Sequence, residues 1–108
     1  MADRQDPWSV IYARQVAGHL EAVDRKYHGL IRDGIEERLT HEPLVETRNR
    51  KPLTRPSVLG DVWELRLGPG NRFRIFYQAD PDRGEVSVVA IAVKERNRLF
   101  IGGEEIDL

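Results

Sequence analysis

The sequence predicts an α+β fold in which two helices pack on one face of a small antiparallel sheet. Three patterns in the 108 residues support this prediction. A short run of β-branched and aromatic residues comes first, apolar residues at helical spacing follow, and alternating or continuously apolar segments fill the second half of the chain. The order is therefore a strand, a two-helix hairpin and a three-stranded meander, which is typical of helices packed on one face of an antiparallel sheet.

Residues 8–13 are expected to form the first strand, because they follow Pro7 and are rich in β-branched and aromatic side chains. From Gln15 the apolar residues recur every three or four positions, as on one face of a helix. These residues are Val16, Leu20, Val23 and Tyr27, continued by Leu30, Ile31, Ile35 and Leu39. A single helix over 15–40 would be unusually long for so small a domain, so we expect a break near 24–26. Pro43 ends the second helix.

The segment 61–78 predicts a β-hairpin that becomes the centre of the sheet. Its strands are expected at 62–67 and 73–77, and the turn residues at 68–71 join them. The most apolar run of the chain, at 85–93, is expected to form a buried central strand.

Alternation of side chains along the hairpin predicts one apolar face and one charged face. In the first strand Glu64 and Arg66 point away from the apolar residues, and in the second strand Arg72 and Arg74 are expected to do the same. Two or three arginines on one face of a hairpin are suited to holding an anion. Lys94 follows the buried strand directly, and charge at the end of such a strand has a rigid platform.

Charge is distributed unevenly along the chain, although the net charge is only −1. Residues 46–100 contain 11 Lys and Arg against 7 Asp and Glu, a net charge of +4, and the segments before and after them are acidic. The connection 44–59 contributes Arg48, Arg50 and Lys51, and Arg96 and Arg98 follow the last strand. A basic middle is compatible with a phosphate-binding face, and equally with a solvated surface of mixed charge.

The absence of cysteine limits the chemistry that the chain can perform. It excludes disulfides, thiolate nucleophiles and cysteine metal sites, and it leaves His19, His28 and His41 as the only imidazoles. His19 and His28 lack metal-ligand spacing and are expected at the surface or its boundary. His41 follows the second helix, where the exposed carbonyls of the last turn stabilise a cation. We expect no metal site and no cofactor.

The length suits one domain, which we expect over residues 1–108, with its core within 7–100 and an acidic tail at 101–108. The sequence has no apolar run long enough to cross a bilayer and no signal-peptide pattern near its start. A cytoplasmic protein without a membrane partner is the expectation.

The order and spacing of four motifs resemble the RelE/ParE superfamily, the toxins of type II toxin–antitoxin systems. These motifs are KPL at 51–53, VWELR at 62–66, RIFY at 74–77 and KER at 94–96. The resemblance covers residues 8–100. It implies a RelE-like fold and a toxin that inhibits translation as a metal-independent, ribosome-dependent messenger RNA endoribonuclease. By position, Arg66 would hold phosphate, Arg74 would stabilise the transition state and Lys94 would add a further cation.

The resemblance also identifies further candidate residues and departures from the family pattern. The RNA-binding candidates beside the catalytic set are Arg48, Arg50, Lys51, Arg72, Arg96 and Arg98. Phe100 stands where active RelE-like nucleases have a tyrosine, and it has no hydroxyl. Glu64 stands where one branch has a lysine; it is either a base in catalysis or a structural partner of the arginines on its face.

The implied partners follow from the two activities found in the superfamily. An antitoxin protein is expected in either case, lying across the sheet or over the helical hairpin. A nuclease would act on the ribosome and messenger RNA. The alternative is a non-enzymatic toxin, either a ParE-like inhibitor of DNA gyrase or a catalytically weakened member that acts by binding its antitoxin. Intact transcripts with DNA damage would distinguish gyrase inhibition from RNA cleavage.

Overall fold

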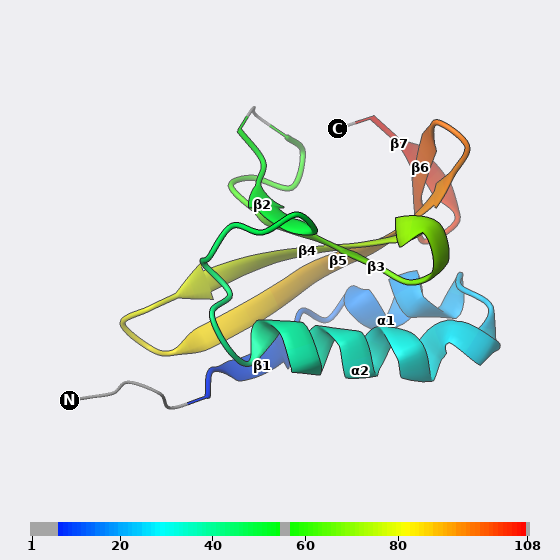
Figure 1. The fold of residues 1–108 in the computed structure, drawn as a ribbon. Coiled ribbons are helices and arrows are strands. Elements are labelled where there is room, and N and C mark those ends of the chain that lie inside the picture. The colour runs from blue at the N-terminus through cyan, green and yellow to red at the C-terminus, as the bar shows by residue number, and fades with distance from the viewer. Residues whose placement is uncertain (1–6, 55–56, 108) are drawn as a thin grey trace.

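The computed structural model describes residues 7–54 and 57–107, which form a twisted sheet with helices on one face (Figure 1). The elements are β1 (Ser9–Tyr12), α1 (Val16–Glu21), η1 (Arg25–Tyr27), α2 (His28–Leu39), β2 (Arg50–Pro52), β3 (Trp63–Leu67), η2 (Pro69–Asn71), β4 (Phe73–Asp80), β5 (Glu85–Glu95), β6 (Arg98–Ile101) and β7 (Glu104–Ile106). The predicted α+β fold is confirmed. None of the helices described here has the length and apolar character needed to cross a membrane.

Strand β5 is the centre of the sheet, whose order is β2-β3-β4-β5-β6-β7. Strand β4 covers one edge of β5, while the opposite edge is shared by β1, which runs parallel to it, and β6, which runs antiparallel. Between these two partners, the side chains of Gln15, just before α1, and His19, within α1, bond to the backbone of β5. Gln15 Nε2 donates to the carbonyl of Val89 at 3.1 Å, and the amide of Ile91 donates to His19 Nδ1 at 3.2 Å.

The predicted break between the helices is confirmed. Helix α1 ends at Glu21, and a short 3-10 turn leads into α2. Asp24 begins this turn, and its side chain accepts a hydrogen bond from the amide of Lys26 at 3.1 Å. The cap satisfies a donor that the first turn leaves free, so the chain reverses direction here and both helices reach the same face of the sheet.

The sheet separates a large apolar core from a smaller one. The helix side holds Val16, Ile31, Ile35, Leu39, Leu65, Leu67, Phe73, Ile75, Tyr77, Val86, Val88 and Ile91. The opposite side, called here the helix-free face, has a small cluster formed by Val62, Phe76, Ala90 and Ala92. Its smaller cluster leaves room on this face for the charged residues of β3 and β4.

Three short strands extend the predicted meander. Strand β2 lies at the edge of the sheet, in the connection 44–59, and β6 and β7 form a hairpin after β5. Strand β7 occupies part of the segment expected as an acidic tail, of which Leu108 lies outside the described residues. These strands contain three or four residues each and are polar or mixed in sequence, so they lack the apolar alternation that identifies a strand.

Candidate anion-binding site

Strand register brings charged side chains together on the helix-free face. Arg66 of β3 lies directly opposite Arg74 of β4, and Glu64 of β3 lies opposite Lys51 of β2. Directly opposed residues of antiparallel strands point to the same face. Lys94 belongs to this face as well, because it lies two positions beyond Ala92, the partner of Arg74 on β5.

Glu64 joins the two arginines through a buried ion-pair network. Its Oε1 lies 3.4 Å from Arg66 Nε, and its Oε2 lies 3.2 Å from Arg74 Nη1. Arg74 also donates from Nε to the carbonyl of Asn71 at 3.0 Å. Glu64 is only 6% exposed and Arg74 only 8%, whereas the side chain of Arg66 is 32% exposed. The network therefore fixes Arg74 and leaves part of the Arg66 guanidinium open to a ligand.

A cleft of about 410 Å³ lies beside this network, between the segment around β2 and strand β3. It is lined by Glu46, Lys51, Pro52, Leu53, Thr54, Glu64 and Arg66. Lys51 and Arg66 give the cleft two cations, and Glu46 places an exposed carboxylate at the same opening. The sequence prediction omitted Glu46. It lies in a polar connection without a recognisable motif, and only the folding of that connection against β3 brings it here.

Both carboxylate oxygens of Glu64 are engaged with arginines, which favours a structural role over proton transfer. A base must be free to accept a proton from a bound substrate. Glu64 instead orients Arg66 and neutralises part of the charge of Arg74. Of the two interpretations left open by the sequence, the geometry supports the structural partner.

Arg50, predicted as an RNA-binding residue, does not belong to this face. It pairs with Leu65, so its side chain points to the helix side. Its Nε donates to the carbonyl of Val45 and its Nη1 to that of Arg38, both at 2.8 Å. The Arg38 carbonyl lies in the last turn of α2, where orphan carbonyls need donors. Arg50 therefore anchors the connection to the helix end and is only 8% exposed.

Arg72 also lies on the other side of the sheet from Arg74, contrary to the predicted alternation. Its backbone is helical, with φ −67° and ψ −32°, so the alternation of a strand does not begin until the next residue. The guanidinium lies 5.6 Å from the ring centroid of Tyr27 and 5.8 Å from that of Phe73. An ion pair of 3.5 Å with Glu95 holds it there.

Comparison with known proteins identifies the architecture. No family model matches the sequence, and no curated protein matches it. A chain of the toxin–antitoxin complex RelBE2 from Mycobacterium tuberculosis superposes with a TM-score of 0.69 at 22% identity, covering 86% of this chain and 98% of that one. A chain of the RelE–RelB complex from Pyrococcus horikoshii OT3 gives 0.56 at 17% identity, covering 83% and 98%. This chain has the RelE fold.

On this RelE fold, Phe100 lies on the helix side of the sheet. It pairs with Val93 on β5, and both side chains point to the helix side. The arginines lie on the opposite face of the sheet.

Three further candidate RNA-binding residues are exposed around the sheet. Arg48 lies in the turn before β2, and the neighbouring Asn49 carbonyl accepts the amide of Arg66 at 2.8 Å. Arg96 lies in the β5–β6 turn with φ 59°, and Arg98 forms a 3.8 Å ion pair with Glu105. Their exposure leaves all three available to a partner.

Two of the histidines contribute to the fold. His28 Nε2 lies 2.8 Å from the carbonyl of Val23 and bonds across the break between the helices. His19 accepts a hydrogen bond from β5, and burial lowers its pKa below the ordinary value. Within residues 7–54 and 57–107, no three His, Asp or Glu side chains gather as a metal site would require.

Proposed function

We propose that the protein is the toxin of a type II toxin–antitoxin system and that its helix-free face binds and cleaves messenger RNA on the ribosome. The observation that carries this proposal is the pair of opposed arginines, Arg66 and Arg74, joined by the buried Glu64. The RelE fold and its occurrence in two toxin–antitoxin complexes support it.

The geometry suits charge stabilisation during cleavage of an RNA strand. In such a reaction the ribose 2′-oxygen attacks the adjacent phosphorus in line, the bond to the 5′-oxygen breaks, and a 2′,3′-cyclic phosphate and a 5′-hydroxyl result. Charge builds on the phosphate oxygens in the transition state. Arg66 contacts these oxygens with the open part of its guanidinium, while Arg74 adds positive charge from a fixed position. Lys51 on β2 and Lys94 on β5 lie on either side of the arginine pair, where they flank the RNA strand.

Proton transfer requires a group other than Glu64. Glu46 is the carboxylate that lines the same cleft and is exposed, so it can accept the proton of the 2′-hydroxyl. In this scheme Glu64 positions the arginines, and the ribosome supplies the remaining groups. Replacing Glu46 with Gln would then reduce cleavage and leave the fold unchanged, because Glu46 is an exposed residue.

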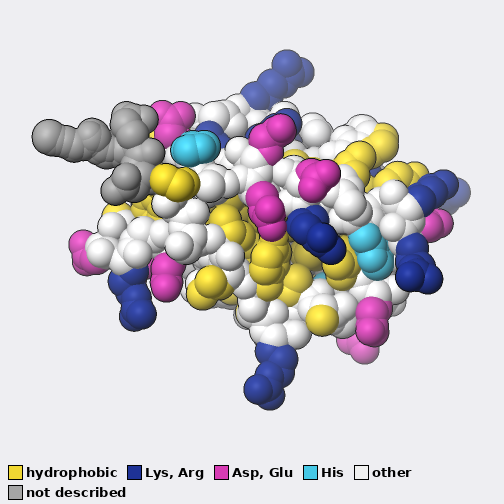
Figure 2. Space-filling model, turned by 90° about the horizontal axis from the view of Figure 1, so that it is seen from below, with side chains coloured by type: hydrophobic (Ala, Val, Ile, Leu, Met, Phe, Trp, Pro, Cys, Tyr) yellow, Lys and Arg dark blue, Asp and Glu magenta, His cyan; other side chains and the backbone are white. Residues whose placement is uncertain are grey.

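The helix side offers a site for the antitoxin. An apolar groove of about 380 Å³ runs between the two helices, lined by Tyr12, Ala17, Leu20 and Ile31 among others. Figure 2 shows hydrophobic side chains gathered in a strip across the middle of this face. Arg14 and Arg32 lie at its edge. These features fit an amphipathic segment of the antitoxin with acidic flanks.

A non-enzymatic toxin that inhibits DNA gyrase is the second candidate. The buried Glu64 favours it, because a carboxylate held between the two arginines weakens their attraction for phosphate. The two candidates differ in the target that is damaged.

Induced expression in bacteria separates these functions. The nuclease predicts growth arrest with cut transcripts, and Arg66→Ala should relieve both effects. Arg83→Ala is the matched control, because Arg83 is an exposed arginine of the β4–β5 turn. Arrest with intact transcripts and DNA damage would instead identify the gyrase inhibitor.

A further inference from the structure

Two turns border the arginine pair of the helix-free face, at the same end of β3. The first turn, residues 47–50, leads into β2, and the amide of Thr47 donates to the carbonyl of Arg50 at 2.7 Å to close it. The second is the η2 turn, which joins β3 to β4. Each turn supports one of the two arginines through a backbone carbonyl.

The first turn supports Arg66. The carbonyl of Asn49 accepts the amide of Arg66 at 2.8 Å and so extends the pairing of β2 with β3. Within the turn, the amide of Asn49 donates to Oγ1 of Thr47 at 3.3 Å. Arg48, an exposed cation, is the neighbour of Asn49 in this turn. A displacement of the turn would therefore move Arg48 relative to Arg66.

The η2 turn supports Arg74 through Asn71. Nε of Arg74 donates to the Asn71 carbonyl at 3.0 Å, while Nη1 of the same guanidinium contacts Glu64. Asn71 has a φ of 53°, a left-handed conformation that asparagine adopts more readily than most residues with a side chain. Asn71 therefore fits the backbone of the turn and offers a side-chain amide as well.

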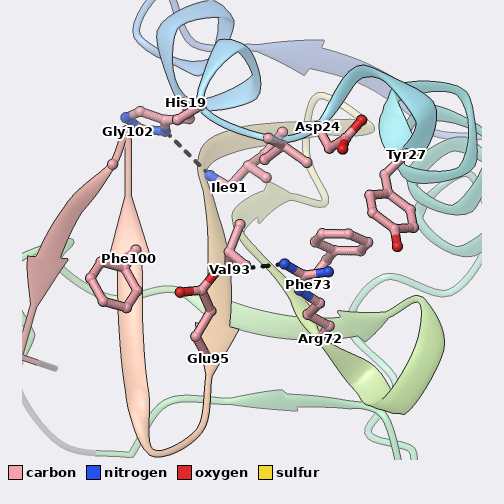
Figure 3. A pocket seen from close by; sticks show the side chains of 13 residues that line it. His19, Asp24, Tyr27, Arg72, Phe73, Ile91, Val93, Glu95, Phe100 and Gly102 are labelled. Atoms are coloured by element: carbon pink, nitrogen blue, oxygen red, sulfur yellow. Dashed lines mark hydrogen bonds and ion pairs between the residues drawn. The ribbon is translucent and has the colours of Figure 1, made fainter.

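Contacts on the helix side fix the end of the η2 turn. Arg72 is paired with Glu95 at 3.5 Å, and its guanidinium lies beside the rings of Tyr27 and Phe73 (Figure 3). The carbonyl of Arg72 accepts the amide of Lys94 at 2.8 Å, which connects the turn to β5. The η2 turn is therefore a rigid support to which the first turn can be attached.

A hydrogen bond between two side chains joins the turns. Nδ2 of Asn71 donates to Oδ1 of Asn49 at 3.3 Å, and both residues are partly buried. Within residues 7–54 and 57–107 it is the one hydrogen bond between these two turns. In each asparagine the backbone carbonyl supports an arginine, and the side-chain amide contacts the other asparagine. We name this contact the asparagine bridge.

We propose that the asparagine bridge holds the turn of Arg48 beside Arg66 and Arg74, so that the three cations contact the backbone of one RNA strand together. Asn49 and Asn71 are then positioning residues, which act through the arginines and touch no reacting atom. The inference rests on the proposed binding of RNA at this face. An exposed turn that is fixed in the free protein does not have to be ordered when the strand binds, so the bridge increases affinity.

Binding of a strand that cannot be cleaved tests the bridge. The probe is a fluorescent six-nucleotide 2′-O-methyl adenylate, which lacks the attacking hydroxyl. Asn71→Gly removes the side-chain amide and keeps the positive φ, which glycine adopts freely, and Asn49→Ala removes the acceptor. Each variant should weaken binding by about fivefold. The double variant should also lose about fivefold, rather than about 25-fold, because the two side chains form one contact.

Two controls separate positioning from a general effect on the fold. Asn97→Ala changes an exposed asparagine of the β5–β6 turn and should bind as the wild type does. Affinities are measured well below the unfolding temperature of every variant. A bridge that only stabilised the fold would lower that temperature and leave the affinity of the folded protein unchanged.

The remaining outcomes overturn the proposal. It is wrong if the wild type does not bind the probe, if either single variant binds as tightly as the wild type, or if the double variant loses the product of the two single effects. Ribosome-dependent cleavage by the wild type is measured in parallel. Cleavage with unchanged affinities of the variants rejects the bridge alone, while the expected affinities without cleavage retain the bridge and reject the nuclease.

Discussion

At the scale of single residues, the negative charge of the Glu64 carboxylate determines how the arginines of the helix-free face are held. Glu64 is buried and contacts two arginines, so its negative charge holds Arg74 within the sheet at a position that would otherwise be unfavourable for a cation. Removing one member of a buried ion pair leaves the other charge without compensation. Glu64 therefore affects both anion binding on the helix-free face and the stability of the sheet.

Glu64→Gln should lower the free energy of unfolding by about 3 kcal/mol, because Arg74 loses its buried counter-charge. Urea unfolding measures the change. Glu85→Gln is the control, since it removes a carboxylate from the Arg83–Glu85 pair, in which Arg83 is exposed and Glu85 partly exposed, and it should cost less than about 1 kcal/mol. Equal effects of the two substitutions would show that the Glu64 network does not stabilise the fold.

His19 should make stability depend on pH. A histidine in an unfolded chain has a pKa of about 6.5. Burial lowers the pKa of His19 in the folded protein, so the unfolded chain takes up the proton more readily. The stabilisation is complete above about pH 6.5 and is lost as the pH falls from there through the lower folded pKa. Protonation would also remove the acceptor that Nδ1 offers to the Ile91 amide.

The variant His19→Gln tests this dependence, because its side-chain oxygen can accept the same hydrogen bond without titrating. Between about pH 7.5 and about pH 5.5, the wild type should lose more unfolding free energy than His19→Gln. Parallel loss in the two proteins would contradict the role of His19.

At the scale of elements, the η2 turn sets the register that places Arg66 opposite Arg74. Gly68 begins this turn with φ 84° and ψ −178°, a conformation that is essentially restricted to glycine. A Cβ at this position would lie only 2.5 Å from Cδ2 of the buried Phe73. The turn therefore requires glycine both for its backbone and for its packing.

Gly68→Ala should destabilise the protein by about 3 kcal/mol, from the strained backbone and the contact with Phe73 together. Gly70→Ala provides the matched comparison in the same turn. Gly70 also has a positive φ of 62°, but no atom lies within 4 Å of its added Cβ, so the cost should be about 1 kcal/mol. Thermal unfolding of both variants checks the difference, and identical midpoints would refute it.

Local patterns predicted the longer elements correctly. The apolar spacing around α2 and the continuous run of β5 indicated their types, and Asp24 caps the turn where the helices were expected to break. Face assignments along the hairpin were right for Glu64 and Arg74, because both lie within regular strands. Arg72 was assigned to the wrong face, since a turn conformation at one residue reverses the direction of its side chain.

The candidate site could be predicted only where strand alternation determines it. The burial of Arg50 depends on carbonyls of Arg38 and Val45 that become neighbours through folding of the connection. The same folding brings Glu46 to the cleft. Tertiary contacts of this kind leave no periodic signal in the chain, so neither position could be assigned from the sequence.

At the scale of the whole molecule, the proposed RNA and antitoxin sites lie on opposite faces of the sheet. The helix-free face has the arginine pair, and the opposite side, which carries α1 and α2 (Figure 1), has the apolar groove lined by both helices. An antitoxin in this groove would leave the arginines uncovered unless another part of its chain passes around the sheet. Binding of the antitoxin and activity on RNA should therefore be separable by mutation.

Ala17→Trp should fill the groove and weaken antitoxin binding by at least about tenfold, because it blocks the apolar surface that the partner would cover. Glu37→Trp adds the same bulk on the exposed side of α2, outside the groove, and should bind as the wild type does. Calorimetry with the purified antitoxin measures both affinities. Unchanged binding by Ala17→Trp would place the antitoxin elsewhere.

Cleavage by purified components tests the central claim most directly. Ribosomes programmed with a defined messenger RNA are incubated with the wild type, Arg66→Ala or Arg83→Ala, and the RNA ends are mapped. The account predicts cuts by the wild type and Arg83→Ala that end in 2′,3′-cyclic phosphate, and a loss of at least about a hundredfold with Arg66→Ala. Intact RNA with the wild type, or equal cutting by Arg66→Ala, would contradict it.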